Sequence, residues 1–217
     1  MDYRRFFPRV LINVIIMICA VPTMAQEEKP LNLNDIKSQL EKQNEYLRHK
    51  LDQVSRQVDD LMFFHRLGDI AEIDMARITG PPLKHQPNPT AQGVNNPWRF
   101  RVYVFIPKNL NKSKKQPLII LPHGGVHSNF SSGVTNILRE LLTQGYTIVA
   151  PEYRGSTGYG RGTYEAIDFG GLEIEDTYAS RNYMLERYNF LDPKRVGTVS
   201  YTHLRAHETR RYLVCRL

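Results

Sequence analysis

The sequence predicts an α/β fold, with a mostly parallel sheet between two helical layers and a long amphipathic helix in front of it. Three observations carry this prediction. Short apolar runs at Leu118–Leu121 and Tyr146–Ala150, bounded by Pro and Gly, are typical of strands covered on both faces. Segments with helical periodicity follow each run, and Arg195–Val199 indicates a third strand. This order of strand, helix, strand, helix, strand favours right-handed connections between parallel strands.

The periodic segments define two helices. Apolar residues that share one helix face precede Gly145, which is suited to a left-handed helix end: Val134, Ile137, Leu138, Leu141 and Leu142. The second helix spans about Glu173–Tyr188, has acidic residues in its first turn and ends before Asp192-Pro193. Upstream, residues 99–106 alternate between apolar and other side chains, which predicts a strand with one face in the core.

The first 25 residues have the pattern of a secretory signal peptide. Arginines near the start precede an apolar run, Val10–Val21, and small residues end at Ala25. The run is short for a membrane span. We expect cleavage after Ala25 and export to the periplasm or the exterior. An uncleaved leader, which would be the only membrane contact, and a lipid-modified Cys19 are the alternatives.

Composition narrows the class of partner. The chain has 217 residues, of which 41% are hydrophobic and 24% charged, as in an ordinary globular protein with an appendage. Its only cysteines, Cys19 and Cys215, lie near the two ends, so no disulfide framework is predicted. Several charges of the net +7 lie in the leader and the last dozen residues. We therefore predict no nucleic-acid partner.

Residues 26–67 are expected to form a long helix that acts as a spacer. Between Leu33 and Arg66 there is no Gly or Pro, and apolar residues recur at steps of three, four and seven. Gln43 and Asn44 interrupt the apolar stripe, and the step from Leu47 to Leu51 departs from a heptad. A homo-oligomeric coiled coil through residues 33–66 and a helix packed on its own domain both remain open.

Residues 68–98 are rich in Pro, Gly and Asn, which predicts a loop-rich connector. Ile70, Ile73 and Ile78 could form a short edge strand within it. The domain boundary is placed here, so that residues 99–199 form the body of the protein.

Four motifs in this body resemble the catalytic domain of the prolyl oligopeptidase family, which are serine peptidases with the α/β-hydrolase fold. They are His123-Gly124-Gly125, the run Tyr153–Gly160, the segment Gly170–Asp176 and the segment Asp192–Gly197. The likeness covers roughly residues 99–199 and therefore implies the N-terminal half of such a domain. It implies an exported serine peptidase that acts on a peptide through an acyl-enzyme.

The resemblance also implies roles for the glycine-rich loops. The Gly125 N–H is the expected oxyanion donor, in a turn that Gly124 helps to form. His123 supports this turn, because the catalytic acid and histidine of this fold come after the nucleophile. Tyr153, Arg154 and Gly155 are expected to support the site, with Arg154 paired to Glu175 or Asp176. No cofactor is implied.

The resemblance ends at the position of the nucleophile. The family's Gly-x-Ser-x-Gly turn would follow Val199, but Ser200–Leu204 places Thr202 where serine is expected, and both glycines are absent. Residues 200–217 also look like translated sequencing adapter, so we expect a non-native tail and an inactive fragment. His203 and His207 are not a predicted zinc site, since no glutamate lies between them.

Two other functions remain open at this stage. A carboxylesterase that acts on small or sugar esters could use the same oxyanion geometry. A non-catalytic scaffold protein that self-associates through residues 33–66 would need no active site at all.

Overall fold

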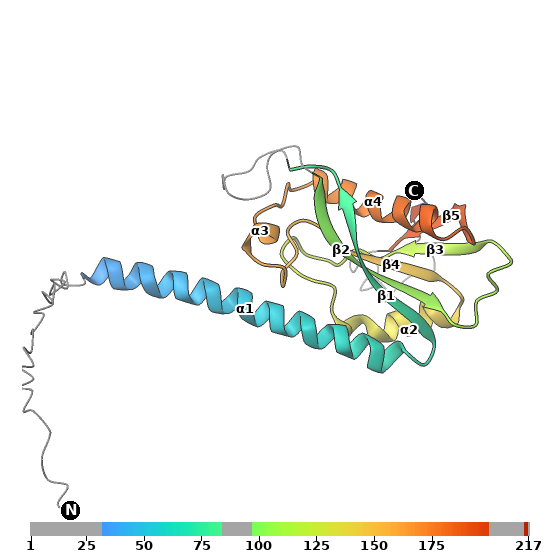
Figure 1. Cartoon of the computed structure of the whole chain (residues 1–217), viewed down its shortest axis with the longest axis horizontal. Helices are drawn as coiled ribbons and strands as arrows, with labels where there is room; N and C mark the ends of the chain where they lie inside the picture. The colour runs from blue at the N-terminus through green and yellow to red at the C-terminus, as the bar shows by residue number, and fades with distance from the viewer. Residues whose placement is uncertain (1–31, 84–96, 200–214, 217) are drawn as a thin grey trace, which may run out of the picture. The chain divides into compact units, whose positions relative to one another are not determined.

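The computed structural model describes residues 32–83, 97–199 and 215–216 (Figure 1). The chain divides into two compact units, Met1–Gln39 and Leu40–Leu217, and the contacts described below lie within the second. The helices are α1 (Leu33–Leu67), α2 (Thr135–Thr143), α3 (Arg161–Tyr164) and α4 (Leu172–Arg187), with a 3-10 turn at Ser132–Val134. The strands are β1 (Ala71–Gly80), β2 (Trp98–Pro107), β3 (Gln116–Ile120), β4 (Thr147–Glu152), β5 (Leu191–Thr198) and β6 (Cys215–Arg216).

The predicted α/β fold is confirmed, and its parallel part is the predicted strand, helix, strand, helix, strand unit. The sheet order is β1-β2-β4-β3-β5-β6, and β3 pairs in parallel with both β4 and β5. The remaining pairs are antiparallel, so the sheet as a whole is mixed. Gly145 has the expected left-handed conformation, with φ of 87°, two residues after the end of α2.

Helices cover both faces of this sheet. One buried cluster lies between the sheet and α4 and contains Val104, Ile120 and Met184. The other lies under α1 and α2 and contains Phe63, Tyr103, Phe105, Leu138 and Ile148. Figure 1 shows α4 on the opposite side of the strands from α2.

Strand β2 differs from its prediction because both of its faces are buried. Phe100, Val102 and Val104 pack on the side of α4, as the alternation indicated. Tyr103 and Phe105, which were assigned to the other face, are also fully buried, under α1 and α2. Their rings contact the rings of Phe63 and Phe130. The face of β2 that was predicted to be exposed is therefore covered by an aromatic cluster.

The segment that we expected to be a connector contains a full strand. Ten residues, Ala71–Gly80, form β1 and pair with β2 along its whole length, from Ala71 opposite Pro107 to Gly80 opposite Trp98. Charged and polar residues stand between the apolar residues of this edge strand, so the sequence shows no continuous apolar run. The sheet thus begins well before residue 99.

Helix α1 also differs from a spacer, because its C-terminal half belongs to the core. Phe63 and Leu67 are fully buried in the cluster that contains Tyr103 and Phe105. The expected apolar stripe lies elsewhere: Leu47, Leu51, Val54, Val58 and Leu61 are all exposed by more than half. The helix thus has one face on the sheet and a separate apolar face in solvent.

The leader, Thr202 and most of the tail lie outside the described residues. Of the tail only β6 is described, as two residues antiparallel to β5. Within the described part, no helix is both long enough and apolar enough to cross a membrane.

Candidate functional site

The two glycine-rich loops meet where β3 and β4 end. The loop after β3 carries His123, Gly124 and Gly125, and the loop after β4 carries Tyr153 and Arg154. Because these strands are parallel neighbours, their carboxyl ends lie at the same edge of the sheet, where ligands bind in open α/β folds.

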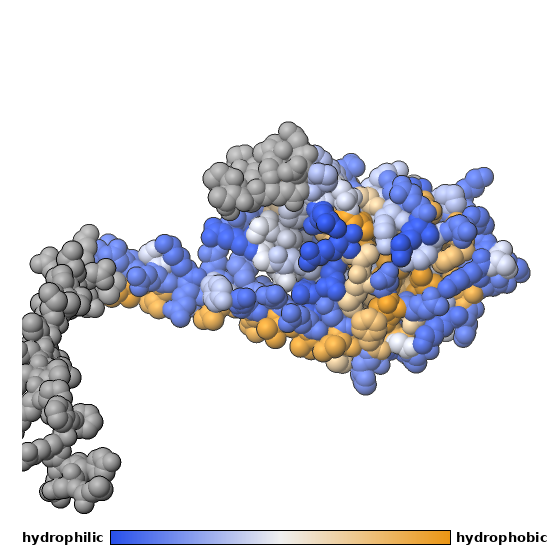
Figure 2. All heavy atoms as spheres, in the orientation of Figure 1, coloured by the Kyte–Doolittle hydropathy of each residue, from blue (hydrophilic) through white to orange (hydrophobic). Residues whose placement is uncertain are grey.

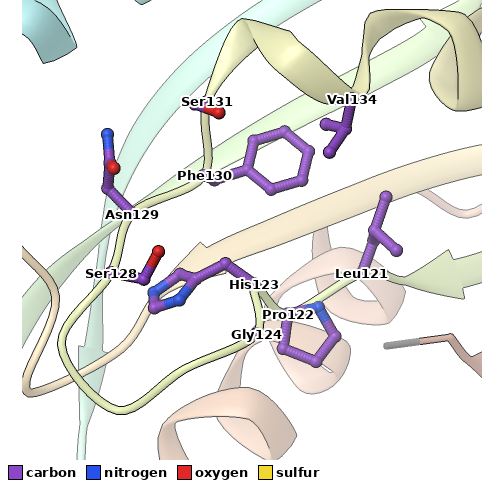
Figure 3. Close-up of a pocket in the computed structure, with 9 residues that line it drawn as sticks. All are labelled: Leu121, Pro122, His123, Gly124, Ser128, Asn129, Phe130, Ser131 and Val134. Carbon is purple, nitrogen blue, oxygen red and sulfur yellow. The ribbon is translucent and has the colours of Figure 1, made fainter. Parts of the chain in front are cut away.

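A cavity of about 340 Å³ opens beside the first loop. Figure 3 shows its lining around the space between this loop and the start of α2: Leu121, Pro122, His123, Gly124, Ser128, Asn129, Phe130, Ser131 and Val134. The lining combines apolar side chains with hydroxyl and amide groups, which is typical of a small-ligand site. Gly125 is in the same loop but does not line this cavity.

The hydroxyl of Tyr153 joins the two loops. It lies 2.8 Å from the carbonyl oxygen of Gly125, 3.0 Å from that of His123 and 3.1 Å from His123 Nδ1. The Tyr153 ring also stacks on the His123 ring, with centroids 4.2 Å apart. These contacts fix the direction of the peptide groups around Gly125.

Gly125 has a backbone conformation that favours glycine in a tight turn. Its φ of 83° lies in the left-handed region, which is strained for other residues. Its carbonyl is held by Tyr153, while its N–H is not paired with any acceptor in the described part of the chain. An unpaired N–H that lies between two held peptide groups can stabilise an oxyanion.

His123 is placed as a structural residue. It is 9% exposed, and burial lowers its pKa to about 4, so the ring is neutral at pH 7. Its Nδ1 faces the Tyr153 hydroxyl and its Nε2 lies 2.8 Å from Ser156 Oγ. Both nitrogens are therefore engaged within the loops.

Ser156 and His123 have the spacing of a catalytic pair but not its accessibility. Ser156 is fully buried, and its hydroxyl donates to the carbonyl oxygen of Tyr153 at 2.6 Å. A nucleophile must reach its substrate, so this pair does not supply one. It instead ties the start of the second glycine loop to the first.

Glu152, at the end of β4, is a buried acid whose environment sequence reasoning missed. Burial raises its pKa to about 8, so most of it is neutral at pH 7. Its Oε1 accepts a hydrogen bond from the Phe130 amide at 2.8 Å, and its Oε2 lies 3.6 Å from His123 Nε2. The residue links β4 to the loop that lines the cavity. Only the three-dimensional burial reveals this environment.

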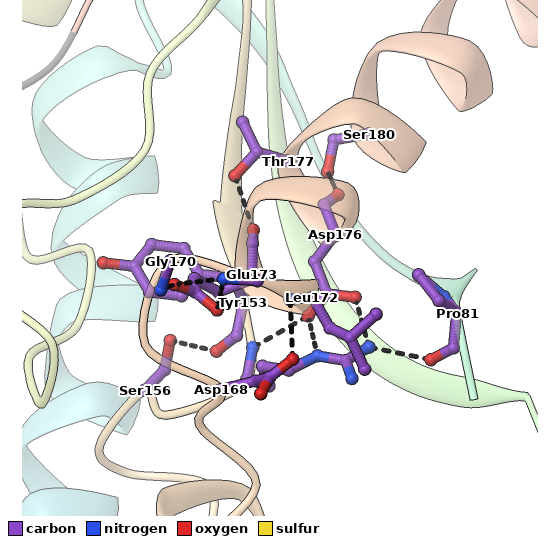
Figure 4. Close-up of polar contacts among 12 residues, drawn as sticks. Pro81, Tyr153, Ser156, Asp168, Gly170, Leu172, Glu173, Asp176, Thr177 and Ser180 are labelled. Carbon is purple, nitrogen blue, oxygen red and sulfur yellow. Dashed lines mark hydrogen bonds and ion pairs between the residues drawn. The ribbon is translucent and has the colours of Figure 1, made fainter. Parts of the chain in front are cut away.

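Arg154 binds Asp176 rather than Glu175. Its Nε and Nη2 each donate to the Asp176 carboxylate at 2.8 Å, and neither side chain is exposed. Figure 4 marks the contacts of the Asp176 carboxylate and of the Pro81 carbonyl oxygen with dashed lines. Nη2 also donates to the carbonyl oxygen of Pro81 at 2.7 Å. The pair attaches the loop after β4 to α4. Gly155, which follows, has a φ of 97°, and a Cβ there would lie 2.8 Å from Ile167.

Helix α1 and His127 also hold the second loop, which the sequence did not indicate. Arg56 Nε donates to the carbonyl oxygen of Gly158 at 3.1 Å, and a Cβ on Gly158 would lie 3.1 Å from that of Arg56. His127 Nδ1 lies 3.0 Å from the carbonyl oxygen of Gly155, and its ring stacks on Tyr164. The two loops and α1 form one packed unit.

The end of β5, after which the nucleophile is expected, lies beside β3 and its following loop. Thr198, the last residue of β5, pairs with Ile120, and the Val199 amide donates to the Ile120 carbonyl at 3.0 Å. Val199 therefore lies next to the end of β3, which leads into the loop that carries Gly125. Thr202 itself lies outside the described residues. Within the described ranges, no group of three or more His, Cys, Asp or Glu could hold a metal.

Comparisons with known proteins agree with these motifs. A profile described as "Prolyl oligopeptidase family" matches residues 133–199. Dipeptidyl-peptidase 5 of Aspergillus fumigatus is 36% identical over 97 residues, 43% of this chain and 14% of that protein. The acylamino-acid-releasing enzyme of Mus musculus is 26% identical over 106 residues, 48% of this chain and 14% of that enzyme. This chain thus spans about one seventh of the length of these relatives.

A solved structure of a puromycin-hydrolyzing peptidase from Mycobacterium tuberculosis is also similar. It is 22% identical, with a TM-score of 0.48. The match covers 60% of this chain and 19% of that one.

Proposed function

Since this chain carries part of a prolyl oligopeptidase family domain with an α/β-hydrolase fold, we propose that the intact protein is an exported serine peptidase. The observation that carries the proposal is the Gly125 amide. It has no acceptor among the described residues, the Tyr153 hydroxyl contacts the carbonyl groups of the peptides before and after it, and its loop lies next to the end of β5. This is the arrangement that acyl transfer needs beside a nucleophile on the turn after β5.

The proposed reaction passes through an acyl-enzyme. A serine hydroxyl at that turn attacks the peptide carbonyl, and a histidine takes the hydroxyl proton. The Gly125 N–H donates to the oxyanion of the tetrahedral intermediate, which contributes about 3 to 4 kcal/mol for comparable donors. The C–N bond then breaks, the amine leaves with the histidine proton, and water hydrolyses the acyl-enzyme. The serine, the histidine and its acid are not among the described residues.

We propose that the 217-residue chain itself is inactive, because Thr202 stands where the serine is expected. A fluorophosphonate probe, which labels activated serines, tests this directly. The folded chain should show no more labelling than the same chain after heat denaturation. Stoichiometric labelling of the folded chain alone would overturn the proposal.

Assays of the intact protein with paired substrates distinguish a peptidase from an esterase. A peptide anilide and the ester with the same acyl group should both be hydrolysed by a peptidase. Hydrolysis of the ester alone would favour a carboxylesterase, for which the same oxyanion donor serves. Export is tested by the mature N-terminus, which we expect to be Gln26 in the periplasm or medium.

A further inference from the structure

The exposed side of α1 carries a heptad pattern of apolar residues. An apolar residue recurs at every seventh position, at Leu33, Leu40, Leu47, Val54 and Leu61. If these are d positions, the a positions are Lys37, Asn44, Leu51, Val58 and His65. Asn44 then belongs to the repeat, and the step from Leu47 to Leu51 is an ordinary step from d to a. Asn44 and the step from Leu47 to Leu51 are thus both part of the heptad pattern. We call these a and d residues from Leu40 to Leu61 the seam.

The helix uses its other side to bind the domain. Its buried residues are Arg56 and Phe63, at f positions, and Leu67, at a c position. Asp59, at b, accepts a hydrogen bond from the Ser132 amide at 2.8 Å, and Asp60, at c, accepts one from the Tyr103 hydroxyl at 2.7 Å. Positions b, c and f lie opposite a and d on a helix. Contact with the domain therefore leaves the seam accessible.

The seam residues are exposed despite their apolar character. Their exposed fractions include 69% for Leu51, 54% for Val54, 52% for Val58 and 71% for Leu61. Figure 2 shows the resulting hydrophobic row along α1, beside hydrophilic surface. A continuous apolar face of this kind in water normally marks an interaction site.

We propose that a second copy of this chain binds the seam and that the two α1 helices form a parallel, two-stranded coiled coil. A heptad repeat is self-complementary, so an identical helix presents matching knobs and holes. Asn44 determines the orientation. In a parallel pair the two Asn44 side chains meet and can hydrogen-bond to each other, whereas an antiparallel pair would place each of them against an apolar seam residue.

The apolar area is sufficient for a stable dimer. The six apolar seam residues are Leu40, Leu47, Leu51, Val54, Val58 and Leu61. Each can bury on the order of 100 Å² of side chain. Two copies would then bury on the order of 1,200 Å², which is at the lower limit for stable interfaces. The sequence pattern continues to Leu33, which would add to this area.

The mass of the full chain in solution tests the proposal. Light scattering after size exclusion should give about twice the 25.2 kDa of one chain. Leu47→Asp combined with Val54→Asp should give a monomer with an unchanged circular dichroism spectrum, because both residues lie outside the core. Ile174→Asp, at an exposed apolar residue on α4, is the matched control and should remain a dimer. A monomeric wild type would overturn the proposal, even if another protein bound the seam. A double variant that remained a dimer would also overturn it.

Cross-linking tests the parallel orientation. In a chain with Cys19→Ser and Cys215→Ser, Asn44→Cys should form a disulfide-linked dimer on mild oxidation. Lys42→Cys, at an f position on the same turn, should not. Dimers that fail to cross-link at position 44 would overturn the parallel arrangement. Asn44→Leu should in addition raise the mass toward trimers or larger oligomers, because a polar a residue restricts the oligomeric state.

Discussion

The carboxylate of Asp176 accepts three hydrogen bonds from Arg154. They come from the backbone amide at 3.0 Å and from Nε and Nη2 at 2.8 Å each. Because Arg154 also donates to Pro81, the pair joins the loop after β4 to α4 and to the end of β1. The stability of the second glycine loop should therefore depend on a buried charge pair.

Replacing one member of this pair should be costly. Asp176→Asn leaves the Arg154 charge buried without its counter-charge, which typically lowers the free energy of unfolding by about 3 to 5 kcal/mol. Urea unfolding measures this change. Glu175→Gln, at the exposed neighbouring acid, is the control and should stay within about 0.5 kcal/mol of wild type. Equal effects of the two substitutions would show that the pair does not stabilise the fold.

Gly80 allows Asp176 to approach β1. A methyl group at this position would lie 2.9 Å from a ring carbon of Phe100 and closer still to Asp176 Oδ1. Gly80→Ala should therefore lower the free energy of unfolding by about 1 to 3 kcal/mol. Gly162→Ala is the matched control, because no atom lies within 4 Å of its Cβ and a helical alanine is favoured. If Gly80→Ala matched this control in stability, close packing at this site would be excluded.

Local periodicity was sufficient to predict the parallel unit. The runs around Leu118 and Tyr146 are strands because each is apolar and short, and Gly145 ends α2 because only glycine adopts its φ without strain. The positive charge of Arg154 and the adjacent acids Glu175 and Asp176 also limited the expected partners of Arg154 to these two residues. Such features depend on residues within one element or on an obvious charge partner.

Properties that arise from tertiary packing could not be predicted. The Leu and Val stripe of α1 dominates its sequence pattern, yet the helix binds the domain through Phe63 and Leu67 on another face. The pKa of Glu152 is raised by its burial, and its carboxylate is held by the amide of Phe130, a residue 22 positions away in the chain. No pattern in the glycine loop indicates that Arg56 reaches Gly158 across 102 positions.

The raised pKa of Glu152 should make the free energy of unfolding fall as the pH rises. Its pKa is about 8 in the folded chain and 4.5 when free, so between these values the folded state binds more protons than the unfolded state. Unfolding free energy then decreases as pH rises, by up to about 1.4 kcal/mol per pH unit. The effect of His123 has the opposite sign between pH 4 and 6.5: its folded pKa is lowered from 6.5 to about 4, so the free energy of unfolding rises with pH in this range. The two effects offset each other in that range, and the decline should appear between pH 6.5 and 8.

Glu152→Gln isolates this effect. Urea unfolding at pH 6.5 and at pH 8 should give a clear loss for wild type and little difference for the variant, whose amide does not titrate. Glu186→Gln, at an exposed acid of α4, should keep the wild-type decline. A wild-type stability that does not change over this range would contradict the raised pKa of Glu152.

Phe63 and its neighbour Phe64 provide a test of whether α1 is part of the domain. Phe63 is fully buried, with ring centroids 5.2 to 5.6 Å from those of Tyr103, Phe105 and Phe130, whereas Phe64 is 51% exposed. Phe63→Ala should lower the free energy of unfolding by about 3 to 5 kcal/mol, because a cavity forms in the aromatic cluster. Phe64→Ala should lower it by about 0.5 kcal/mol or less. Unfolding by urea at one protein concentration compares the two variants. If α1 were only a spacer, both substitutions would have the same small effect; a much larger effect of Phe63→Ala would mean that the helix is part of the domain core.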